Sequence, residues 1–225
     1  MTKAIIKNGR FKYGITLCSL IVTFLMLIKI EGVDALDAVR VLFGGYPLRR
    51  MILILAFVMS IALLQYLNLD SIMCFLRKNT CFLIRYKKRK TLIYKLLKYI
   101  FLINIVFIGL IVIAFGISAV VCGLDIFGID VFQALELGFR GYIMCICCSL
   151  IQVISMIKTD EANTFMTMIA ISVLGVFLSR IKIGIFTIFP SKMIINEMYI
   201  NLLICSLYII AEIYFCIMMF QKKES

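Results

Sequence analysis

Two groups of side chains are of types that could do chemistry. Cys145, Cys147 and Cys148 lie within four consecutive positions, and thiolates are ligands for soft metals. Glu212 is an ionisable residue inside a long apolar run, where a carboxylate is costly unless it is paired, protonated or hydrated. The chain contains no histidine, so it offers no imidazole base, no imidazole metal ligand and no Ser-His catalytic pair.

Packing explains the cysteine group better than metal binding does. Cys145 and Cys148 share a helix face, but no second Cys-x-x-Cys pair and no histidine accompany them. Most of the nine cysteines lie in apolar runs, where a thiol behaves as a small hydrophobic residue. We therefore interpret them as small residues for helix packing in lipid, and favour this over a metal site or a disulfide scaffold.

Glu212 is open to two interpretations. An intramembrane carboxylate marks a functional interior by default, but here it could instead make a structural polar contact within the last apolar run. We favour the structural contact, because a proton-coupled carrier would show more ionisable residues along a route. The candidate intramembrane polar residues are Glu212, Gln65 and Gln152, with Asn104 as a further partner by type.

Known catalytic motifs are missing from the sequence. It contains neither a Walker phosphate loop nor a GxSxG element, so the chain cannot power itself with ATP. Asp125 and Asp130 lie in a predicted outer loop rather than within spans, which disfavours a paired-aspartate protease. We expect no catalytic residue and no cofactor in this chain.

Hydropathy predicts the elements that position these residues. Of 225 residues, 64% are hydrophobic, and the mean hydropathy is +1.09, whereas soluble domains are about 45–50% apolar. A membrane-spanning helix needs roughly 20 apolar residues. The sequence therefore predicts an all-α, multi-pass membrane protein forming one domain, residues 1–225. Its six spans are expected at about 13–30, 51–67, 99–121, 138–157, 164–179 and 197–220.

The basic residues predict the orientation. Residues 69–98 contain nine Lys and Arg against one acid, Asp70, and Lys or Arg near span ends resist translocation. We expect this loop and both termini to be cytoplasmic, with 31–50, 122–137 and 180–196 outside. Because this bias accounts for the net charge of +12, nucleic-acid binding is disfavoured.

Two connections have unusual compositions. Residues 180–196 are too short to span and too apolar for an ordinary loop, which favours a re-entrant or interfacial segment. Glu31, Asp34 and Asp37 recur every three residues, so a short helix there would carry an acidic stripe, interpreted as a solvated face.

The order of these features resembles the membrane subunit of ABC-2 type transporters, an architecture like that of type V exporters. The string FLIRYKKRK at residues 82–90 is also similar to one found in small ABC-2-like permeases of low-GC Gram-positive bacteria. Those permeases often occur near peptide-antibiotic or immunity genes.

The resemblance implies that the 69–98 loop docks into an ABC ATPase, which would carry the ATP and Mg²⁺. It also implies pairing with a second copy or a sister permease, and export of an amphipathic peptide or lipid-like cargo across the bacterial cytoplasmic membrane. Two alternatives remain: a bacteriocin immunity protein that does not transport, and a small ATP-independent channel or carrier. The residues implied to contact the ATPase are Met73, Phe75, Leu76, Arg77, Lys78, Phe82, Leu83 and Arg85.

Overall fold

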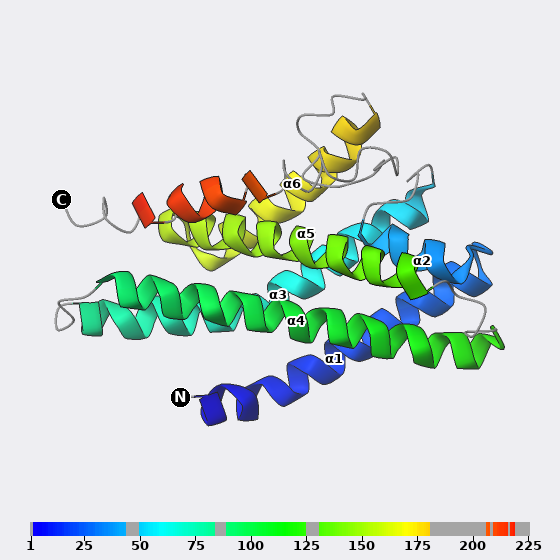
Figure 1. Cartoon of the computed structure of the whole chain (residues 1–225), viewed down its shortest axis with the longest axis horizontal. Coiled ribbons are helices and arrows are strands. Elements are labelled where there is room, and N and C mark those ends of the chain that lie inside the picture. The colour runs from blue at the N-terminus through cyan, green and yellow to red at the C-terminus, as the bar shows by residue number, and fades with distance from the viewer. Residues whose placement is uncertain are drawn as a thin grey trace.

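The described part of the chain is helical throughout. The computed structural model describes residues 2–43, 50–83, 89–124, 131–180, 206–207, 209–215 and 217–218, and these residues contain no strand. The helices are α1 (Thr2–Lys29), α2 (Ala35–Leu42), α3 (Met51–Leu83), α4 (Arg89–Cys122), α5 (Val131–Lys158) and α6 (Glu161–Arg180). Residues 209–215 add a further helical piece near the C-terminus (Figure 1). The all-α prediction is confirmed for these residues.

Four helices are long and apolar enough to cross a membrane. Their apolar stretches are Phe11–Lys29, Met51–Leu69, Tyr94–Cys122 and Phe132–Met156, which correspond to the first four predicted spans. In the described residues α6 contributes only a shorter apolar stretch, Ala162–Leu174. The sixth predicted span, 197–220, lies partly outside the described residues. The chain is therefore a helical membrane protein, and the count of six spans stays a prediction.

The segment 69–98 differs from the loop expected there. Helix α3 continues past its apolar stretch to Leu83, and α4 already begins at Arg89. The two helices run side by side, and the end of α3 and the start of α4 lie at the same end of the bundle in Figure 1. We call residues 69–98 the α3–α4 hairpin. No Gly or Pro interrupts this segment, so nothing in its sequence ends either helix where it leaves the apolar stretch.

The helices alternate in direction, so their termini lie at two opposite ends of the bundle (Figure 1). The end of α3, the start of α4 and the α5–α6 turn lie at one end. The end of α1, the whole of α2 and the start of α5 lie at the other. At that end α4 terminates at Cys122, where Gly123 takes φ +68° and its amide donates to the Val120 carbonyl. A left-handed glycine of this kind is a common way for a helix to end.

Helix α2 is packed into the bundle. Its residues Ala38, Val41 and Leu42 are fully buried, and the Ser60 hydroxyl of α3 donates to the Leu42 carbonyl at 2.6 Å. The acidic stripe expected here is only partly solvated, because two of its three acids form ion pairs. Asp37 pairs with Arg40 at 2.7 Å, and Glu31 pairs with Arg50 at 2.6 Å.

Two apolar cores follow each other along the bundle. In the larger, α2-side core, the rings of Phe24 (α1) and Phe115 (α4) meet edge to face at 5.7 Å. The hairpin-side core joins α3, α4 and α5, and Ile209 and Ile213 pack against it. Its buried members are Ile72, Leu96, Ile100, Ile146, Leu150, Val153 and Met156.

Candidate functional site

Five polar side chains lie buried where the two apolar cores adjoin. Gln65 and Asn68 come from α3, Asn104 from α4, and Ser149 and Gln152 from α5. Each is at most 1% exposed, and each lies within one of the four apolar stretches. We call these five residues the polar cluster. Polar groups at membrane depth are costly, so they point to a structural or functional requirement.

Ser149 is the centre of one half of the cluster. The Asn68 side-chain amide donates to the Ser149 hydroxyl oxygen at 2.8 Å. That hydroxyl lies 3.1 Å from Asn104 Oδ1 and 2.7 Å from the Cys145 carbonyl, so it has two acceptors within reach. Asn104 in turn donates to the Ile100 carbonyl at 2.9 Å. These bonds link α3, α4 and α5 within the membrane-spanning region.

In the other half of the cluster, only some of the polar atoms have hydrogen-bond partners. Gln152 Nε2 donates to the backbone carbonyl of Gln65 at 3.2 Å. Gln152 Oε1 and both side-chain polar atoms of Gln65 are buried, with no hydrogen-bond partner among the described residues. Unpaired buried amide atoms cost about 1–3 kcal/mol each. Two acceptors and one donor are thus left available to a polar species such as water.

Glu212 lies against the same region of α5. It is half-buried, and its Oε2 atom is buried without a hydrogen-bond partner in the described part of the chain. Its carboxyl is close enough to Cys148 for an electrostatic interaction, and Cys148 is one helical turn from Gln152. The structure thus joins Gln65 to Gln152 and brings Glu212 near them, but it records no bond from Glu212 to either glutamine.

The cysteine group occupies the interior of the bundle. Cys145, Cys147 and Cys148 are buried, and Cys145 and Cys148 belong to the α2-side core. These positions support the interpretation of both residues as packing side chains. Of the remaining cysteines, Cys18 and Cys122 are free thiols.

Sequence reasoning missed Asn68 and Ser149. Asn68 follows Gln65 by three residues, and Ser149 precedes Gln152 by three. That spacing places each pair on one helix face. It is the feature of the sequence from which a second polar residue beside each glutamine could have been predicted. What the sequence could not show is that the two faces meet.

Seven of the eight predicted ATPase-contacting residues belong to the last part of α3. Helix α3 includes residues 73–83, but their side chains lie outside what the structure describes, as does Arg85. Their role stays a prediction. Residues 181–196 of the predicted re-entrant segment also lie outside the described residues.

The geometry thus offers two candidate features: a buried polar cluster with unpaired atoms, and two helices, α3 and α4, that are each longer than the roughly 30 Å hydrocarbon core of a membrane. Comparison of the chain with protein-family models, curated proteins and solved structures finds no match.

Proposed function

We propose that the chain is the permease subunit of an ATP-driven exporter in the bacterial cytoplasmic membrane. The observation that carries the proposal is the length of α3 and α4, the two helices that meet in the α3–α4 hairpin. Helices of 33 and 34 residues are each about 50 Å long, against a hydrocarbon core of about 30 Å. The part of α3 beyond Leu69 alone accounts for about 21 Å. Such a projection offers a separate ATPase a surface outside the bilayer.

The composition of the hairpin suits a protein partner. Residues seven apart return to one face of a helix, so Phe75 aligns with Phe82 and Leu76 aligns with Leu83 on α3. Arg77 and Lys78 follow Leu76 directly. Apolar anchors bordered by basic residues are typical of a docking surface. In the proposed complex the ATPase binds this surface and carries the ATP and Mg²⁺.

Continuous helices give the partner mechanical access to the membrane interior. α3 carries Gln65 and Asn68, and α4 carries Asn104. Displacement of the hairpin by ATP-driven closure of the ATPases would shift these residues against Ser149 and Gln152 of α5. In this mechanism the polar cluster is the junction at which motion of the hairpin opens a route for an amphipathic peptide or lipid-like cargo. A second copy or a sister permease would complete that route.

A photoreactive amino acid at Arg85 tests the proposed partner in cells. We expect it to crosslink an ATPase subunit that carries a Walker phosphate loop, identified by mass spectrometry. A gene for such a subunit beside that of this chain would agree with this result. Crosslinks to lipid only would count against the proposal.

Substitutions on the hairpin then test coupling within that complex. Phe75→Asp with Leu76→Asp should abolish the stimulation of ATP hydrolysis by the permease, while insertion of the permease is preserved. Phe75→Leu with Leu76→Phe keeps the surface apolar and serves as the matched control. Normal ATPase stimulation by the double Asp variant in an assembled complex would refute the docking surface.

A small ATP-independent channel or carrier is the second candidate function. The unpaired atoms of Gln65 and Gln152 favour it, because a membrane-embedded polar site can bind a permeating polar species without a partner. Vesicles containing only the purified chain separate the two candidates. Dissipation of an ion gradient by these vesicles would favour the channel, and tight vesicles would favour the ATP-dependent subunit.

A further inference from the structure

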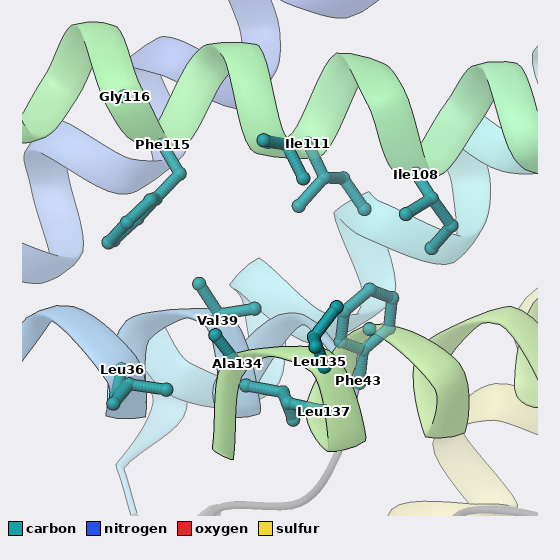
Figure 2. Close-up of a pocket in the computed structure, with 12 residues that line it drawn as sticks. Leu36, Val39, Phe43, Ile108, Ile111, Phe115, Gly116, Ala134, Leu135 and Leu137 are labelled. Atoms are coloured by element: carbon teal, nitrogen blue, oxygen red, sulfur yellow. The ribbon is translucent and has the colours of Figure 1, made fainter. Parts of the chain in front are cut away.

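An apolar pocket of about 470 Å³ lies between α2, α4 and α5, toward the end of the bundle opposite the α5–α6 turn. Figure 2 shows α4 on one side of it and α2 with the start of α5 on the other. The deeply buried residues Ile111 and Phe43, 2% and 3% exposed, form its floor. Val112 and Leu135, 62% and 67% exposed, form its rim. The volume is within the range of about 300–1,000 Å³ typical of ligand pockets.

The lining selects a hydrocarbon ligand. Every residue that lines the pocket is apolar or glycine. A peptide or sugar would bring amide or hydroxyl groups that these side chains could not pair, at a cost of several kcal/mol for each group. A linear alkyl chain has no such groups and gains from burial.

The position of the rim indicates where such an alkyl chain would come from. Val112 and Leu135 belong to the apolar stretches of α4 and α5, so the pocket opens at membrane depth, where the hydrocarbon chains of lipids form the surroundings. We propose that this pocket binds one acyl chain of a bilayer phospholipid. The inference rests on the pocket alone and does not require the proposed exporter function.

The arginines described on α2 and α5, two of the helices that line the pocket, bear on the choice of headgroup. On α2 Arg40 pairs with Asp37, and on α5 Arg140 pairs with Glu136. Each guanidinium therefore already has a carboxylate partner on its own helix. The bound lipid is selected by its tail and not by the charge of its headgroup.

The wall on the α2 side is held in place before any lipid binds. The Phe43 ring packs so closely on Gly141 of α5 that a Cβ at Gly141 would lie 2.5 Å from it. Ser60 bonds to the carbonyl of Leu42, the residue before Phe43. Preformed walls reduce the ordering cost of binding.

Photolabelling tests the site directly. The purified chain is placed in phosphatidylcholine vesicles with a trace of phosphatidylcholine that carries a diazirine in one acyl chain. We expect adducts on Ile111, Val112 and Leu135 to exceed, several-fold, those on Ile105, a lipid-facing α4 residue outside the pocket, 59% exposed. Replacing the carrier and probe with phosphatidylglycerol should leave this ratio unchanged.

Filling the pocket should remove the excess labelling. A Cβ at Gly116, which lines the pocket, meets no atom within 4 Å, so Gly116→Leu can extend into the space. It should reduce the Ile111 and Leu135 adducts to the Ile105 level. Gly109→Leu, on the same helix outside the lining and equally open, should not. Gly138→Leu fills the space from α5 and replaces Gly116→Leu if that variant does not fold.

The proposal fails if pocket residues are labelled no more than Ile105 in the wild-type chain. It also fails if a folded Gly116→Leu or Gly138→Leu variant keeps the excess labelling, or if the excess requires an anionic headgroup. No ATPase takes part in the measurement, so its outcome is independent of the exporter hypothesis.

Discussion

Gln65 and Asn68 lie one turn apart on α3, both essentially fully buried, yet their side chains differ in how they are satisfied. Asn68 donates to Ser149 across the helix interface at 2.8 Å. Both polar atoms of the Gln65 side chain are unpaired in the described part of the chain. Burial of an unpaired amide opposes folding, whereas a buried interhelical hydrogen bond in a membrane contributes about 0.6 kcal/mol on average.

Substitutions at these two positions should therefore change stability in opposite directions. Gln65→Met keeps the side-chain length and removes the unpaired atoms, so it should raise the free energy of unfolding by about 1–3 kcal/mol. Asn68→Leu should lower it by about 0.5–1.5 kcal/mol. Thermal unfolding in detergent micelles measures both. A loss of stability with Gln65→Met would mean that bound water satisfies this amide.

Glu212 gives a second test at this scale. If it serves packing, Glu212→Gln should preserve assembly and transport in reconstituted vesicles, because an amide can still form hydrogen bonds beside Cys148. A cargo-attracting charge predicts normal assembly with poor transport, and we expect the packing result. Ala211→Leu, at an exposed neighbouring position, is the control. Unchanged insertion, assembly and transport with Glu212→Leu would contradict both roles.

Single residues were partly predictable from the sequence. Gln65 and Gln152 stand out as amides within apolar runs, and the structure places them together. The bond from Asn68 to Ser149 joins residues 81 positions apart. Its existence depends on how α3 and α5 rotate toward each other, and periodicity along one helix does not determine that rotation.

At the scale of elements, hydropathy located the four membrane-spanning stretches well but ended the helices too early. It ended the second span near residue 67, yet α3 continues to Leu83. Hydropathy reports where the bilayer ends, whereas the helix itself continues until a breaking residue or a turn intervenes. The burial of α2 could not be predicted from the sequence either, because the residues that cover it lie on other helices, including α3 and α5.

Gly141 is the point at which α2 is fixed to α5. A Cβ there would lie 2.5 Å from the Phe43 ring, so Gly141→Ala must displace the ring and the end of α2. We expect a loss of about 1–3 kcal/mol in unfolding free energy, as for other overpacked sites. Gly138→Ala, one turn earlier with no atom within 4 Å of its Cβ, should be nearly neutral.

Restoring space should rescue the Gly141→Ala variant. Phe43→Leu shortens the opposing side chain, so the double variant should recover part of the lost stability in a thermal unfolding experiment. Equal stability of the Gly138→Ala and Gly141→Ala variants would show that Phe43 does not pack closely on α5.

At the scale of the whole molecule, the alternating helix directions and the distribution of charge divide the connections between helices into the same two groups, one at each end of the bundle. The end of α3 and the start of α4, in a segment rich in Lys and Arg, share one end of the bundle with the α5–α6 turn (Figure 1). The α1–α2 connection lies at the other end, as do the end of α4 and the start of α5, which border a sequence segment with acids and no base. Sequence order and charge predict this grouping without any knowledge of packing, which is why it is accessible to sequence analysis.

The predicted orientation of the bundle in the membrane can therefore be tested at two exposed aspartates. Asp34 and Asp160 are both exposed and lie at opposite ends. In a cysteine-free variant, Asp34→Cys should react with an impermeant maleimide added to intact cells, because its end lacks the concentration of basic residues that resists translocation. Asp160→Cys and Lys88→Cys should react only after the membrane is opened. Labelling of residue 88 from outside intact cells would invert the orientation, and the hairpin could then not meet a cytoplasmic ATPase.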